Sequence, residues 1–477
     1  MRSPYTEQLE KCTQDELWEV AHIKRFLECY TGDEDFRADI ALGERPLADI
    51  ARERGCHLDD LESLRPVFDA DFTQFRADAT TETWPLTARW DLHFMALRNS
   101  LPFYSAIGDT GGEYPGFDDW RRKQVVRTLL DVGAMANFII HPPVAFELSD
   151  GCSVGCWFCG ISAKKFGGHF PLENGGEQFW RETVKAAQSV IGRGMVTAFL
   201  YWATEPLDHP DYLKFVEIYQ DVIGVVPQTT TAIALRDVAK TRLVLENWKS
   251  SRFFPNRFSV LTQQILRRIH REFTAEELLG VELVLQNAES LTGKQTAGRA
   301  VDVQALPDKR KNEQLQEGTI ACVTGFLVNL PNKTVRLVSP TLATTEVPDG
   351  YYVFSEEKFE TPVELARIMR EMIDRESDRM IDAKKPLAIE SRFWFEKDHT
   401  GAFRFRQDNL GFGMELFNSI GPMLQDGSST PNEIAKRAIK AGHDPILTIK
   451  VLDDLINSGL IGGILRPARD ANLIAAG

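Results

Sequence analysis

A regular alternation of short apolar runs and helix-like segments between residues 143 and 285 constrains the fold of this chain most. The helix-like segments lie near 176–193, 210–222 and 236–248, and a fourth ends near 271. The apolar runs predict five strands, at 144–148, 196–202, 228–233, 257–261 and 280–285. Alternation of this kind predicts parallel strands joined by helical crossovers. We therefore expect an α/β fold, a complete or partial (β/α) barrel, with its chemistry at the C-terminal ends of the strands.

Three of the seven cysteines follow the first predicted strand directly. Cys152, Cys156 and Cys159 have the spacing C-x3-C-x2-C. Three thiolates at this spacing can hold three irons of a [4Fe–4S] cube, so that the fourth iron stays open to a small molecule. Two other interpretations remain open, a zinc site that adds His169 and a redox pair of the two inner cysteines. Zinc is less favoured because no second C-x2-C pair follows, and the redox pair does not explain Cys152.

Composition and charge argue against several classes of protein. The chain has 477 residues, of which 43% are hydrophobic and 26% charged, as in an ordinary folded protein of two or three domains. The net charge of −14 argues against nucleic acid as a partner. Neither a signal peptide nor a membrane-spanning apolar run is recognisable, and we expect no membrane partner. The odd number of cysteines favours reduced thiols, and we expect a cytoplasmic protein.

The chain divides into four predicted regions. Residues 1–140 are expected to be mostly helical, 141–318 to form the barrel, and 319–387 to form a hairpin and a helix. Residues 388–477 are expected to contain two strands followed by helices near 413–425, 431–441 and 445–458. This order resembles a winged helix, and in particular the PqqD-like elements that recognise leader peptides in peptide-modifying pathways.

The cysteine run is similar to the signature of the radical S-adenosylmethionine (SAM) enzymes. The resemblance implies a partial (β/α)6 radical SAM barrel, with a [4Fe–4S] cluster on Cys152, Cys156 and Cys159 and with SAM bound to the open iron. Phe158 matches the aromatic residue that packs near the adenine in that family.

A second motif stands where the family pattern places it. The sequence Ala203-Thr204-Glu205-Pro206 ends the second predicted strand, where the family carries a G-G-E-P-like motif that holds the SAM amino group. The chain departs from that pattern at both glycines. Further SAM contacts are expected from polar residues at the fourth and fifth strands, namely Arg257, Ser259 and Gln286.

The longer contexts 145–160 and 24–36 resemble the radical SAM peptide epimerases of ribosomal peptide pathways, the polytheonamide or proteusin type. That family converts L-residues to D-residues: a 5′-deoxyadenosyl radical removes the α-hydrogen, and a cysteine thiol returns hydrogen from the opposite face. The implied partners are a ribosomal precursor peptide with leader and core, and a flavodoxin- or ferredoxin-type reductant. The family's donor falls late in the chain, so Cys322 is predicted to be that thiol, although an isolated cysteine in an apolar run is often a buried hydrophobe.

Two alternatives stay open. The first is another single-cluster radical SAM reaction on a peptide that forms a C–C or C–S bond. The second, from another class, is a metal-binding adaptor without catalysis. No cysteine follows Cys322, so the dense set that auxiliary clusters of the SPASM type require is lacking, which favours a redox-neutral reaction.

Overall fold

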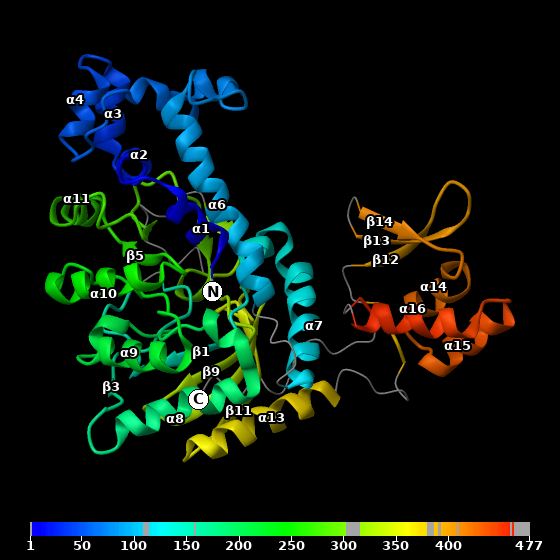
Figure 1. Ribbon diagram of the computed structural model, residues 1–477. Coiled ribbons are helices and arrows are strands. Elements are labelled where there is room, and N and C mark those ends of the chain that lie inside the picture. Colours follow the sequence, from blue (N-terminus) through cyan, green and yellow to red (C-terminus); the bar gives the residue numbers. More distant parts are fainter. Residues whose placement is uncertain are drawn as a thin grey trace.

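The computed structural model describes residues 2–107, 114–156, 159–301, 315–378, 386–389, 393–407, 410–457 and 460–461. It is a mixed α/β structure with small sheets at its centre, helices at one end and a separate module beside them (Figure 1). Among the described residues, no helix combines the length and the apolar character that crossing a membrane requires.

A series of parallel strands forms the centre. β1 (Val144–Glu147) pairs with β9 (Gly325–Asn329) on one side, and on the other side Ala145 bridges to Phe199, which bridges to Gln228. The series continues in parallel through β4 (Thr230–Thr231), β5 (Asn256–Val260) and β6 (Val281–Leu285). From β1 to β6, spatial neighbours are therefore successive in the chain. Within the described residues β6 does not pair with the other end of the series, so the barrel is not closed.

One predicted strand differs from its expected form. The second, at 196–202, is reduced to the bridges of Phe199, because the 3-10 helix η4 (Gly192–Thr197) takes up its first residues. The hairpin after residue 319 is confirmed, since β9 pairs antiparallel with β10 (Thr334–Pro340) and β10 with β11 (Tyr351–Lys358). Because β9 also pairs with β1, strands from both sides of residue 318 belong to one sheet.

Helices cover the strands because each has one apolar stripe. In α8 (Gly176–Ile191), Trp180, Val184, Ala187 and Ile191 follow the helical repeat, and all are fully buried. The ring of Trp180 meets Phe146 of β1 edge-on, with centroids 5.0 Å apart. Other helices of this part include α7 (Pro115–Val132), η3 (Gly133–Phe138), α9 (Tyr212–Ile223), α10 (Val238–Ser251), α11 (Gln263–Glu272) and α13 (Pro362–Asp378).

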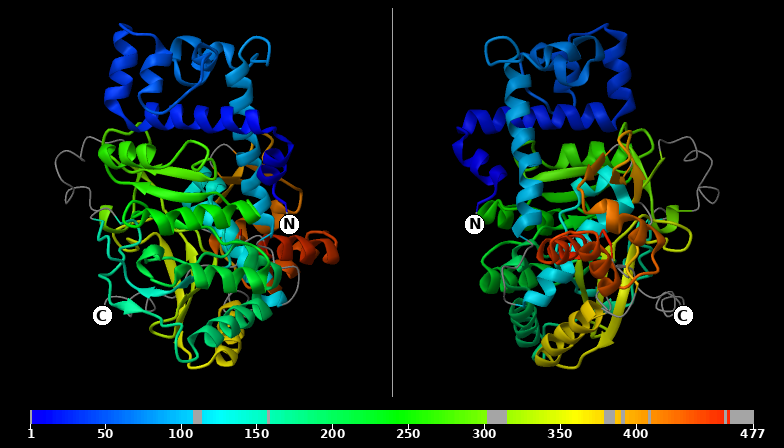
Figure 2. Two further views of the ribbon diagram at one scale, coloured as in Figure 1. Left: turned by 60° about the vertical axis from the view of Figure 1, so that its left-hand side comes forward. Right: turned by 90° about the vertical axis from the view of Figure 1, so that its right-hand side faces the viewer.

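The N-terminal part consists of helices stacked against α10, α11 and their strands, as both views of Figure 2 show. They are α1 (Pro4–Lys11), α2 (Gln14–Gly32), α3 (Glu34–Leu42), α4 (Leu47–Arg52), η1 (Leu61–Leu64), α5 (Arg65–Phe68), η2 (Ala70–Phe75) and α6 (Pro85–Ile107). A capping box of Thr13 and Glu16 begins α2.

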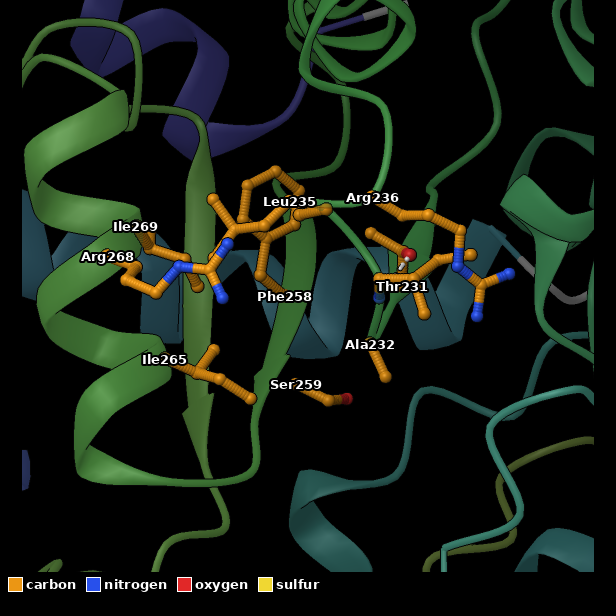
Figure 3. A pocket seen from close by; sticks show the side chains of 11 residues that line it. Thr231, Ala232, Leu235, Arg236, Phe258, Ser259, Ile265, Arg268 and Ile269 are labelled. Atoms are coloured by element: carbon orange, nitrogen blue, oxygen red, sulfur yellow. Dashed lines mark hydrogen bonds between the residues drawn. The ribbon is translucent and has the colours of Figure 1, made fainter.

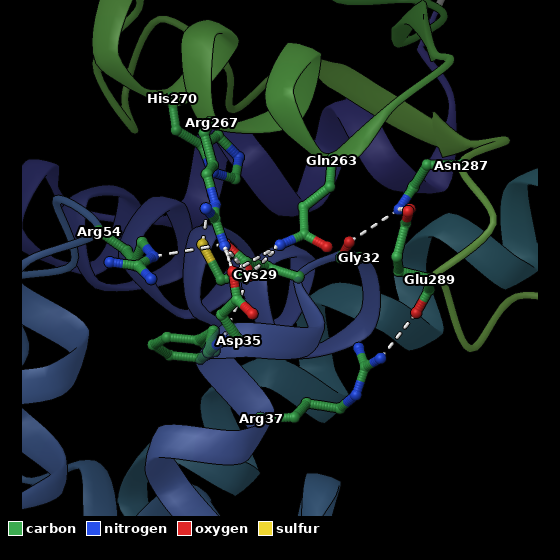
Figure 4. Close-up of polar contacts among 12 residues, drawn as sticks. Cys29, Gly32, Asp35, Arg37, Arg54, Gln263, Arg267, His270, Asn287 and Glu289 are labelled. Carbon is green, nitrogen blue, oxygen red and sulfur yellow. Dashed lines mark hydrogen bonds and ion pairs between the residues drawn. The ribbon is translucent and has the colours of Figure 1, made fainter.

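A buried carboxylate, that of Asp33, ties these helices to α11, and Figure 4 labels two of its partners there, Arg267 and Gln263. Asp33 caps α3 through the N–H of Phe36, and its side chain is 1% exposed. Arg267 of α11 donates to both of its oxygens, at 2.6 and 2.7 Å. Arg54 and Gln263 contact the same carboxylate at 3.4 and 3.0 Å.

We expect Asp33→Asn to lower the free energy of unfolding by about 2 to 3 kcal/mol, because it removes a buried charge-assisted pair. Asp35→Asn is the matched control. Asp35 bonds the same Arg267 at 2.5 Å, but its side chain is 63% exposed, so the loss should stay below about 1 kcal/mol. Urea unfolding at pH 7 measures both variants, and equal losses would contradict the importance of burial.

The C-terminal module has its own core. β12 (Trp394–Lys397), β13 (Phe403–Gln407) and β14 (Leu410–Gly413) form an antiparallel sheet in chain order. The helices α14 (Phe417–Asp426), α15 (Pro431–Lys440) and α16 (Pro445–Asn457) pack on it. The sequence predicted two strands here; β14 was missed because its Leu-Gly-Phe-Gly run has glycine at every second position.

Candidate functional site

The cysteine loop begins where β1 ends. β2 (Ser149–Asp150) and β3 (Gly168–His169) pair across its base, and the N–H of Cys152 donates to the carbonyl of Lys164 at 2.9 Å. Gly151 has a φ of +79°, and a β-carbon there would lie 2.5 Å from the carbonyl oxygen of Lys165, so only glycine fits. Phe158, the expected adenine contact, lies outside the described residues.

The three thiols share a polar and partly exposed environment. Burial, followed by the neighbouring Cys159 and Cys152, raises the pKa of Cys156 to about 11. Burial also raises the pKa of Cys152, although the N–H groups of Val154 and Gly155 act against it. The N–H of Ala163 donates to the sulfur of Cys159 at 3.3 Å.

This donor set fits an iron–sulfur cluster. Backbone N–H groups that face sulfur stabilise the thiolate form that a metal requires. In the described part of the chain, no three His, Cys, Asp or Glu side chains are grouped so that they could hold a metal ion. A cube places each thiolate on a different iron, so its ligands need not converge on one point. His169, the zinc ligand considered above, instead bonds the hydroxyl of Ser149 at 3.1 Å.

The turn of residues 203–206 is fixed by two buried carboxylates. Glu147, at the end of β1, accepts from the N–H of Ala203 at 3.0 Å and from the side chain of Asn329 at 2.9 Å. Glu205 accepts from the hydroxyl of Thr231 at 2.6 Å and from the N–H of Ala232 at 2.8 Å. Our sequence reasoning missed Glu147, although an acidic residue at the end of an apolar strand is a visible signal.

Glu205 lies beside the cysteine loop. It is 3% exposed and precedes Pro206, the first residue of the 3-10 helix η5 (Pro206–Asp208), while Thr204 is half-buried. Burial raises the pKa of Glu205 from 4.5 to about 7, and its hydrogen bonds offset only part of that effect. Its charge in turn contributes to the raised pKa values of Cys152 and Cys156. A cation placed here would favour the ionised carboxylate.

This pKa gives a pH prediction. Between about pH 4.5 and 7 the unfolded chain loses the Glu205 proton while the folded protein keeps it, so stability falls as pH rises through this window. The free energy of unfolding should fall by about 3 kcal/mol across this pH window. Glu205→Gln should flatten the pH dependence, whereas the exposed control Glu173→Gln should leave it unchanged. Urea unfolding from pH 4.5 to 8 tests this, and an unchanged slope in Glu205→Gln would contradict it.

A polar bridge joins the loop to the segment after β4. Asp208 accepts from the N–H and hydroxyl of Ser153 at 3.0 and 2.6 Å. Arg236 donates to Asp208 at 2.8 Å and to the Ser153 hydroxyl at 3.2 Å. Arg236 and Ser259 also line a cavity of about 240 Å³ (Figure 3).

The other two expected SAM contacts lie elsewhere. Arg257 pairs with Glu282 of β6 at 2.7 Å and does not line this cavity. Gln286 follows β6 directly, and its N–H donates to the carbonyl of Val260 at 2.8 Å. The structure therefore brings Ser259 to the cavity and separates Arg257 and Gln286 from it.

Cys322 lies in the segment that leads into β9, not within the strand as the sequence suggested, because β9 begins at Gly325. It packs in an apolar cluster with Ile161, just after the cysteine loop, and with Ala203 of the turn. Burial raises the pKa of Cys322 to about 12, with Arg257 acting against it, so the thiol keeps its proton at neutral pH. Cys29 and Cys56, two further free thiols, are buried among the N-terminal helices.

A protein of Sinorhizobium fredii (strain NBRC 101917 / NGR234), described as the uncharacterized protein y4wI, is similar to this chain. The two are 34% identical over 458 residues, which cover 94% of this chain and 88% of that protein. An alignment of this length must span both the cysteine loop and Cys322. No family model and no solved structure matches the chain.

Proposed function

We propose that this chain, which belongs to the same family as the Sinorhizobium fredii protein y4wI, is a radical SAM enzyme that converts L-residues of a ribosomal precursor peptide to D-residues. The observation that carries the proposal is a juxtaposition. Cys322 lies in one apolar cluster with Ile161, just after the cysteine loop, and with Ala203 of the turn at 203–206, although the three come from distant parts of the chain. The strand series is then the partial radical SAM barrel.

In this proposal each residue of the site has a role. Cys152, Cys156 and Cys159 hold the cluster, and bound SAM supplies the 5′-deoxyadenosyl radical that removes the α-hydrogen of the substrate residue. Glu205, buried beside the cysteine loop, would be the residue that binds the ammonium group of SAM. The cavity lined by Ser259 and Arg236 would take the polar remainder of SAM.

Cys322 returns the hydrogen. Removal of the α-hydrogen leaves a planar carbon, and a hydrogen atom from the opposite face inverts it. The S–H bond of Cys322 breaks as the new C–H bond forms, and the sulfur radical then takes one electron from the reductant and one proton from solvent. The raised pKa keeps the hydrogen on sulfur before the step, and the partial exposure of the residue permits exchange with water.

The C-terminal module is proposed to recruit the peptide. Its three strands followed by three helices are consistent with a PqqD-like element. Within the described residues β12 and β14 pair only with β13, and the side chain of Gln425 accepts from the N–H of Phe395 on β12, so β14 is the edge proposed to receive an extended leader peptide. A flavodoxin- or ferredoxin-type protein supplies electrons, and reduced cysteines are consistent with the cytoplasm.

Reaction in heavy water tests the proposal. The purified protein is reconstituted anaerobically, then incubated with SAM, a reductant and the precursor peptide encoded beside its gene. Epimerisation adds one deuterium at each inverted residue and leaves the mass unchanged in ordinary water. A loss of two hydrogens would indicate C–C or C–S bond formation instead, and peptide binding without SAM cleavage would indicate an adaptor.

A further inference from the structure

A segment from outside the cysteine loop lies directly against it. η6 (Gly298–Ala300) places Arg299 so that its N–H donates to the carbonyl of Cys159 at 3.0 Å. The guanidinium donates to the carbonyl of Cys156 at 2.6 Å and to the carbonyl of Ala163. One residue therefore binds carbonyls at both proposed cluster ligands of the C-x2-C pair and at the end of the loop.

The backbone around Arg299 is built for close approach. Gly298 has a φ of +58°, and a β-carbon there would collide with the carbonyl of Cys159. Its N–H donates to the carbonyl of Pro348 at 2.5 Å, in the connection between β10 and β11. Ala297 and Ala300 are buried. The connection between β10 and β11 therefore supports η6 in its contact with the cysteine loop.

Arg299 also places a positive charge beside the cysteine loop. A guanidinium stays protonated at all relevant pH values, and carbonyl oxygens do not neutralise it. Among the described residues, no carboxylate forms an ion pair with Arg299. A positive charge beside a cluster held by three thiolates favours the reduced state, which carries one more negative charge. Because Arg299 is exposed, solvent screens part of this effect.

We infer that Arg299 is a positioning residue with two effects. Its hydrogen bonds to the carbonyls of Cys156, Cys159 and Ala163, together called the latch, hold the cysteine loop against η6, and its charge raises the reduction potential of the bound cluster. The redox part of this inference rests on the proposed function, since it requires a cluster. The latch does not, because the contacts exist between protein groups alone. The two parts can therefore be tested separately.

The test uses the full chain with Arg299→Gln, which removes the charge, and Arg299→Lys, which keeps the charge but loses the planar fork. Arg367→Gln on α13, an exposed arginine paired with Glu371, is the control. Hydrogen exchange of residues 159–163 in the protein before reconstitution reports the latch. Iron content and an EPR-monitored redox titration after reconstitution report the cluster.

We expect faster exchange in both Arg299 variants, a more negative midpoint potential in Arg299→Gln, and a potential close to that of the wild type in Arg299→Lys. Wild-type exchange rates in both variants would overturn the latch. A wild-type potential in Arg299→Gln with full iron content would overturn the redox role while the proposed function stands. A wild-type protein that binds no cluster would instead overturn the proposed function and, with it, the redox role.

Discussion

The Cys322→Ala variant is expected to bind its cluster and to cleave SAM, yet to form no D-residues. The substitution removes only the S–H group from an apolar cluster, so the fold and the cysteine loop stay intact. The substrate radical then has no donor on its opposite face. Chiral amino-acid analysis of the product peptide should fall from full conversion to below detection, and deuterium from heavy water should no longer enter with inversion.

Cys12→Ala is the matched control for this experiment. Cys12 is also a partly exposed free thiol, but it follows α1 in the N-terminal region. We expect it to retain wild-type D-residue formation. Normal inversion in Cys322→Ala would remove Cys322 from the mechanism, and a parallel loss in Cys12→Ala would move the donor to the N-terminal helices.

The second large effect concerns the cluster ligands. Replacing Cys152, Cys156 and Cys159 together by alanine should abolish both iron binding and SAM cleavage, because the loop contains no other cysteine that could bind iron. Val154→Ala shortens a side chain of the same loop without touching a ligand, and we expect it to bind iron like the wild type. SAM cleavage in the triple variant would contradict the assignment of the site.

The central strands could be predicted because their apolar runs are short and separated by helical repeats. All five predicted segments contribute to the parallel series, even where 196–202 provides only the bridges of Phe199. The pairing of β1 with β9 could not be predicted, because almost 180 residues separate the two strands. Both are short apolar segments, and nothing in either sequence identifies the other as its partner. Register between distant strands is set by packing that no local pattern encodes.

The site was predictable to a similar degree. The spacing of the cysteines and the order of Glu205 after them are local signals, and the structure brings both into one region. The contacts of Glu147, Asp208 and Arg299 are not local, because each side chain bonds a segment far away in the sequence. Arg257 was expected at SAM from its position on a strand, but its partner Glu282 on the neighbouring strand gives it a structural alternative.

The proposed function depends most on the cluster and its chemistry, so one measurement tests it most directly. The wild-type chain is purified and reconstituted without oxygen, and is then given SAM and a strong reductant. We predict about four irons per chain, as a [4Fe–4S] cube requires, and release of 5′-deoxyadenosine and methionine. A fully folded protein that binds a single zinc ion, or no metal, and leaves SAM intact would contradict the proposed function.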